Sequence, residues 1–115
     1  MAKSSFVGEF SVTVGAATAG IVVGDRAPYD ALRCFDLLAA SSSGSAPAMV
    51  TFGFMSGDRK IYAGSFLPTI DKQVVRLRGK LWLPGEWRPF AEFSGVAQGD
   101  VLKLYTYGYV TDRVD

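Results

Sequence analysis

The stretch at 74–110, VVRLRGKLWLPGEWRPFAEFSGVAQGDVLKLYTYGYV, holds the clearest alternation of apolar and polar residues in the chain. Between 75 and 83, apolar residues and one glycine occupy the odd positions. The even positions hold Arg76, Arg78, Lys80 and Trp82. This period of two is typical of a β-strand with one buried face. Two more alternating runs follow, at 87–94 and 101–110, so the stretch predicts three consecutive antiparallel strands.

The length of the turn at 84–86 predicts how the first two of these strands pair. An odd number of loop residues sets odd positions opposite odd positions and keeps the apolar residues on one face. A three-residue turn, Pro84-Gly85-Glu86, therefore pairs Leu83 with Trp87. The same register places Arg78 opposite Glu92 and Trp82 beside Arg88, where a cation–π contact is possible.

The rest of the chain is also rich in strand signals. Residues 6–14 alternate, and 17–23 form a flatter strand that could pair with the first through Gly15. Residues 50–66 indicate a hairpin with its turn at 56–59.

Residues 30–40 allow two interpretations. Leu32, Phe35 and Leu38 have helical spacing, whereas a strand would point Leu32, Cys34 and Leu38 inward. In that strand Asp36 would lie among inward residues, which is costly for a charge without a partner. We favour the strand because every neighbouring segment reads as a strand.

Eight strands with turn signals between them are typical of a sandwich or barrel. We therefore expect an all-β protein with a single eight-stranded antiparallel sandwich, similar to a jelly roll. The 115 residues suit one domain, 1–115, with a flexible N-terminal arm at 1–5 and a flexible loop at 41–47.

Composition argues against several classes of function. The formal net charge is +1, whereas proteins that bind nucleic acid need a marked basic excess. Histidine is absent and Cys34 is the one cysteine, so histidine-based catalysis, common zinc sites and an intrachain disulfide are excluded. Glu86 and Glu92 would lie ~20 Å apart along a strand, too far for a glycosidase pair. We expect that the protein is not an enzyme and binds neither a metal nor a cofactor.

The start of the chain has no signal-peptide pattern, and no apolar run is long enough for a membrane span. The sequence therefore predicts a protein made in the cytoplasm, with no membrane partner. Cys34 is expected to be a buried, inert thiol.

Two rows of side chains are candidate binding surfaces. The basic row of Arg76, Arg78 and Lys80, with Trp82, could bind nucleic acid, an anionic glycan or an acidic protein surface, although an ordinary solvated sheet face would look the same. Tyr105, Tyr107 and Tyr109 lie opposite the row that Leu102 and Leu104 contribute to the core. They could form a subunit or partner interface, where tyrosine is enriched, or stack on carbohydrate. Alternatively, they could simply pack within the fold.

In architecture and composition the chain resembles the jelly-roll decoration, or cement, proteins of tailed-phage capsids. The resemblance rests on the final segment GVAQGDVLKLYTYGYV, the polar start MAKSS and the loop SSSGSAP. It implies a non-enzymatic virion protein of a bacteriophage, often a homotrimer, that binds the major capsid protein and clips neighbouring capsid subunits together. The alternative is a carbohydrate- or receptor-binding module, for example one associated with a phage tail.

Overall fold

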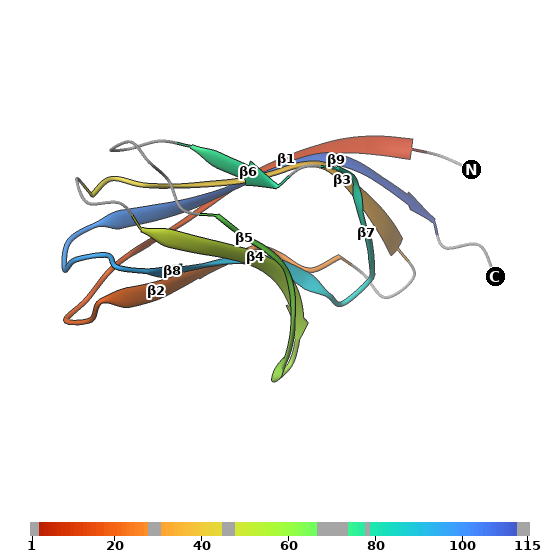
Figure 1. Cartoon of the computed structure of the whole chain (residues 1–115). Coiled ribbons are helices and arrows are strands. Elements are labelled where there is room, and N and C mark those ends of the chain that lie inside the picture. The colour runs from red at the N-terminus through yellow and green to blue at the C-terminus, as the bar shows by residue number, and fades with distance from the viewer. Residues whose placement is uncertain (1–2, 28–30, 45–47, 67–73, 78, 113–115) are drawn as a thin grey trace.

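The protein is all-β, and the computed structural model describes residues 3–27, 31–44, 48–66, 74–77 and 79–112 (Figure 1). Its strands are β1 (Lys3–Thr13), β2 (Ala19–Val23), β3 (Ala31–Ser42), β4 (Met49–Ser56), β5 (Arg59–Phe66), β6 (Val75–Leu77), β7 (Leu81–Pro84), β8 (Arg88–Ser94) and β9 (Val101–Asp112). Segment 30–40 is therefore a strand, as predicted.

The strands form two antiparallel sheets that pack face to face. Sheet A has the order β1-β9-β3-β6, with β7 also paired to β3, and sheet B has the order β2-β8-β4-β5. The first strand pairs with the last, the second with the second last, and so on inward to the β4–β5 hairpin. The chain is thus one long hairpin wrapped into a sandwich. This topology confirms the predicted eight-stranded jelly roll, with β6 and β7 as two halves of one strand position.

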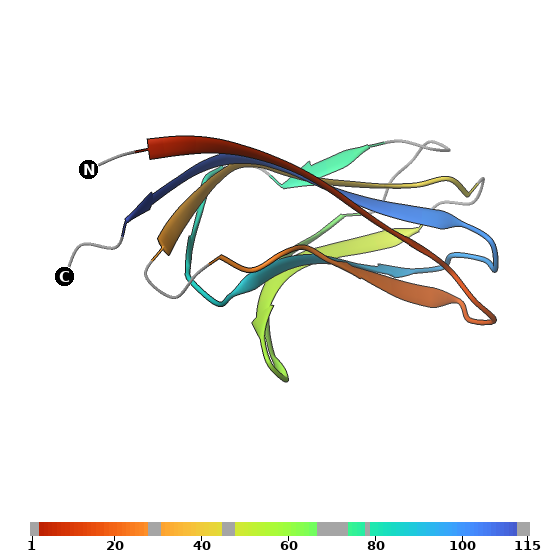
Figure 2. The same cartoon turned by 180° about the vertical axis from the view of Figure 1, so that it is seen from behind.

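The predicted three-stranded unit at 74–110 is wrong, because strands that follow one another there lie in opposite sheets. β7 and β9 both pair with β3 in sheet A, while β8 pairs with β2 and β4 in sheet B. Leu83 therefore lies opposite Arg33 and not Trp87, and neither Glu92 nor Arg88 pairs with this strand. β1 and β2 are likewise separated, because β1 pairs with β9. Figure 2 shows the chain crossing between the layers at these connections.

β3 explains how Asp36 is accommodated in a strand full of apolar residues. The register of β3 on β9 shifts between Phe35 and Leu37, so Asp36 is an extra residue in a β-bulge and is exposed. The bulge changes which positions face the core: Arg33 and Phe35 point inward before it, and Leu38 and Ala40 after it. The expectation that Cys34 faces the core is thus wrong, although the thiol is fully buried.

The core lies between the sheets and is filled mainly by aliphatic and phenylalanine side chains. Those that are almost fully buried include Phe35, Val50, Phe52, Leu83, Ala91, Phe93, Leu102 and Leu104. Val75, Leu77 and Leu81 pack against this core from the expected odd positions. Between them the strand is interrupted, and Gly79 has a φ of 89°, a conformation that favours glycine.

Parts of the expected flexible arm and loop belong to strands, so the prediction of flexibility is wrong for them. Residues 3–5 belong to β1 and pair with residues 109–111 of β9. Ser41 and Ser42 belong to β3, and residues 45–47 lie outside the described residues.

Candidate interaction face

The predicted binding residues that the structure describes share one surface, the outer side of sheet A. Arg76 lies on β6, Trp82 on β7, and Tyr105, Tyr107 and Tyr109 on β9. Arg78 lies outside the described residues. We call this surface the aromatic face and define it by Trp82, the three tyrosines and the apolar side chains among them, Val7, Leu37 and Val74.

Trp82 and Tyr109 meet above the one cysteine. Cys34 of β3 pairs with Tyr109 on one side and with Trp82 on the other. The two rings form an edge-to-face contact with centroids 5.8 Å apart. Cys34 has no exposed surface, so the aromatic pair seals the thiol beneath the face. The hydrogen bond with Cys34, then burial, raises the pKa of Tyr109 above its ordinary value of 10.0.

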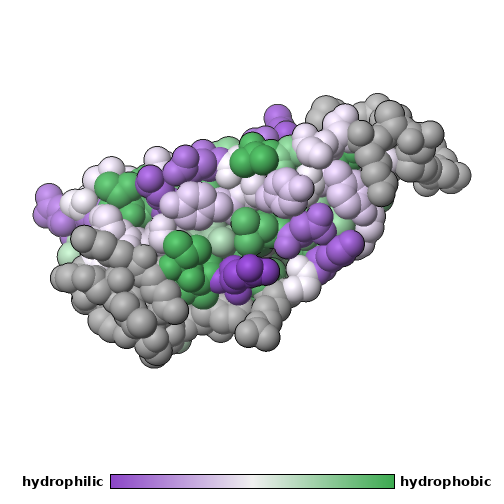
Figure 3. All heavy atoms as spheres, turned by 90° about the horizontal axis from the view of Figure 1, so that it is seen from above, coloured by the Kyte–Doolittle hydropathy of each residue, from purple (hydrophilic) through white to green (hydrophobic). Residues whose placement is uncertain are grey.

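The aromatic face is exposed at its centre and more so at its β1 edge. Tyr107 lies between Val7 of β1 and Leu37 of β3. Val7 is 79% exposed, Trp82 49% and Tyr107 46%. An open hollow of about 510 Å³ runs along Val7, Tyr107 and Leu37. Val74 and Tyr105 are among the other residues that border it. Figure 3 looks down on this side and shows apolar side chains grouped between weakly polar ones.

Charged groups border the aromatic face. Lys103 of β9 pairs with Glu9 of β1 at 3.2 Å. Lys80 lies 3.8 Å from Asp36, the residue of the β3 bulge. Arg76 is exposed beside Tyr105, because both lie opposite Ala39 on β3. An apolar centre with a charged border has the composition of a protein–protein interface.

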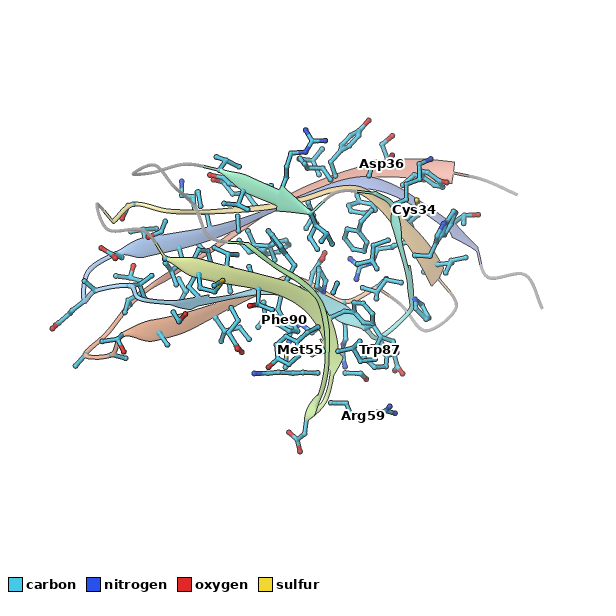
Figure 4. All side chains as sticks on the ribbon, viewed as in Figure 1. Cys34, Asp36, Met55, Arg59, Trp87 and Phe90 are labelled. Carbon is cyan, nitrogen blue, oxygen red and sulfur yellow. The ribbon has the colours of Figure 1, made fainter. Side chains whose placement is uncertain are left out.

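The outer side of sheet B covers its own aromatic residue. Phe90 of β8 and Tyr62 of β5 both pair with Gly53 of β4, and their rings meet edge to face across it at 5.6 Å. Phe90 has no exposed surface. A side chain at Gly53 would strike the carbonyl oxygen of Ile61 and the Phe90 ring. Figure 4 shows Phe90, Met55 and Trp87 near the bend of the β4–β5 hairpin.

An ion pair completes the cover of sheet B. Lys60 Nζ donates a hydrogen bond to Glu92 Oε2 at 2.9 Å, and this bond raises the pKa of the lysine. The same Nζ atom lies 5.8 Å from the centroid of the Phe90 ring.

Arg33 is a buried residue that the sequence pattern did not reveal. Its guanidinium lies between the sheets, 5.0 Å from the Phe35 ring centroid and 5.8 Å from that of Phe6. It donates to Asp25 Oδ1 at 2.9 Å and to the Trp87 carbonyl at 2.9 Å. These contacts tie β3 of sheet A to the ends of β2 and β8. The sequence does hold one signal for this: Arg33 and Phe35 are two positions apart, so in a strand their side chains point to the same side.

Among the described residues, no three cysteine or carboxylate side chains gather closely enough to hold a metal ion. No helix of the length and apolarity required for a membrane span occurs in the same part of the chain.

Comparison with protein-family models, with curated proteins and with solved structures finds no match to this chain.

Proposed function

We propose that this protein is a non-enzymatic structural component of a virion that decorates the capsid, binding the assembled shell through its aromatic face. The observation that carries the proposal is that the aromatic face is exposed although the fold does not need it. Leu102, Leu104 and Thr106 of β9 already fill the core side of that strand. Tyr107, on the opposite side of the strand, is 46% exposed and is not needed to fill the core.

The size of the molecule allows this role. The two longest dimensions of the molecule are 45 and 26 Å. A face of this extent is large enough for the ~800 Å² per partner that a standard protein interface buries. Jelly-roll sandwiches are a recurrent architecture of viral capsid domains, which agrees with the proposed setting.

The proposed mechanism is passive. A protein that binds the assembled shell and not its dissociated subunits stabilises the shell by mass action. Tyr107 and Trp82 would supply buried aromatic area, and Arg76 would complement acidic groups on the shell. No bond is made or broken.

Co-sedimentation with empty capsids of the virus that encodes the chain tests the proposal. We expect the purified protein to pellet with assembled capsids. It should not bind unassembled capsid protein. A carbohydrate-binding module is the alternative, since Trp82 and Tyr107 present partly exposed rings on which sugars could stack. Tryptophan fluorescence that responds to glycans, with no capsid binding, would overturn the capsid proposal in its favour.

A further inference from the structure

Four of the described strand positions lie at sheet edges, and three of these edges carry features that hinder pairing with another strand. β2 has only five residues. β5 contains a bulge opposite the Phe52–Gly53 step and begins with Arg59 and Lys60. The β6/β7 edge is split into two short pieces by the break around Gly79. Short strands, charges and bulges are the usual means by which proteins protect sheet edges.

β1 has fewer of these protections, although it too begins with a charged residue, Lys3. It has eleven residues, and its register on β9 continues without a shift from Lys3 to Thr13. Residues 4–8, SSFVG, include no charge and no proline. Glu9 follows, but its carboxylate reaches Lys103 on β9, toward the middle of the sheet. Within the described part of the chain, β1 pairs with β9 alone. Figures 1 and 2 both show its N-terminal half lying away from β2.

We propose that the β1 edge pairs antiparallel with the β1 edge of a second copy of this chain, about a two-fold axis at Val7. A second copy fits because an antiparallel edge is complementary to itself, and a two-fold contact of this kind closes without growing into a fibre. Centred on Val7, the register sets Val7 against Val7 and Ser5 against Glu9 of the other copy. No like charges then oppose one another at these positions.

The exposure of Val7 is the reason for centring the register there. At 79%, it is far more exposed than its neighbour Tyr107, and it ends the row that runs from Leu37 through Tyr107. Pairing at Val7 continues this row into the second copy and joins the two aromatic faces into one surface. The resulting assembly is a dimer, not the trimer that the resemblance to decoration proteins implies.

Charged substitutions at Val7 test the pairing. Val7→Lys and Val7→Glu each place like charges opposite one another in a homodimer, so we expect each to raise the dimer Kd at least ~10-fold by analytical ultracentrifugation. An equimolar mixture should form the heterodimer with the wild-type Kd. Ile61→Lys on β5 is the matched control, because Ile61 is also an exposed strand residue but lies on sheet B. Far-UV circular dichroism confirms that each variant is folded.

Oxidative cross-linking tests the register independently. Val7→Cys should give a disulfide-linked dimer, because the two copies of residue 7 are direct neighbours. Ser11→Cys should not, because the two copies of residue 11 would lie eight positions, or ~26 Å, apart. Native Cys34 is buried and does not interfere.

A wild-type chain that stays monomeric at hundreds of micromolar, or a Val7→Lys variant that dimerises with unchanged Kd, would overturn the inference. It is independent of the proposed function: a monomer that pellets with capsids would refute the edge pairing alone.

Discussion

The outer sides of the two sheets treat their aromatic residues in opposite ways. On sheet B, Phe90 is fully buried because Tyr62 and Lys60 of β5 lie over it. On sheet A, Trp82 and Tyr107 are about half exposed, and none of the described strands covers them. Tyr62 and Tyr107 have similar exposures, 54% and 46%, yet Tyr62 contacts a buried ring of its own chain and Tyr107 borders an open hollow. Exposure alone therefore does not identify a binding residue; what lies beneath the ring does.

Removing the principal aromatic residue from each side should have the largest and most unequal effect. Phe90→Ala should lower the free energy of unfolding by about 4 kcal/mol, as for other fully buried phenylalanines. Trp82→Ala should lower it by only about 1 kcal/mol, mainly through the lost contact with Tyr109. Urea denaturation of both variants measures the difference. Equal losses would show that the two sides do not differ as described.

Gly53→Ala should break the cover of sheet B. Its methyl group would meet the Ile61 carbonyl and the Phe90 ring, so we expect a loss of roughly 2 to 3 kcal/mol and increased binding of a hydrophobic dye. Gly15→Ala is the matched control, because no atom lies within 4 Å of that position and its φ is not in the left-handed region. A destabilisation shared by both variants would contradict the packing argument.

The ion pair over Phe90 should contribute less. Lys60→Met should cost about 0.5 kcal/mol at neutral pH, since both partners are partly solvated. Because the Lys60 pKa is raised in the folded protein, this contribution is present below the pKa of the unfolded chain. It is lost as the pH rises through the folded value. The wild type and the variant should therefore converge in thermal stability in strong alkali, and a constant difference would count against the pair.

The smallest expected effect concerns the seal over Cys34. The raised pKa of Tyr109 means that its ionisation, followed by absorbance at 295 nm, should have a higher midpoint than that of an ordinary tyrosine. Subtracting the titration of Tyr109→Phe isolates this phenol, and Cys34→Ala should return its pKa toward the ordinary value. By the same linkage, wild-type stability declines as the pH rises past 10. A Tyr109 titration unaffected by Cys34→Ala would show that the thiol does not act on it.

The sequence predicted which side of a strand a residue faces better than it predicted which strands pair. The alternation in β9 correctly put Leu102 and Leu104 inward and Tyr107 outward, because side-chain direction follows locally from the period of a strand. The pairing of Leu83 with Trp87 failed because parity applies only to strands joined as a hairpin. In a jelly roll most connections cross between sheets, so strand pairing is set by contacts distant in sequence.

Asp36 shows a second limit. A strict period of two placed Cys34 on the core side, but one extra residue in the bulge gives the strand a different inward row on each side of Asp36. The charge is the local sign of this irregularity: an acidic residue within an apolar strand is costly unless it bulges into solvent. The sequence alone could not show that Arg76 and Trp82 share a face with the tyrosines. That grouping depends on β6 and β7 lying on one side of β3 and β9 on the other.

Binding of Tyr107→Gln and Tyr62→Gln to empty capsids tests the central claim most directly. We predict that Tyr107→Gln keeps its unfolding free energy within ~0.5 kcal/mol but weakens capsid binding at least ~10-fold. Tyr62→Gln should lose about 1 kcal/mol of stability and bind as tightly as the wild type. Capsid binding that is weakened by Tyr62→Gln and unaffected by Tyr107→Gln would contradict the assignment of sheet A as the interaction face.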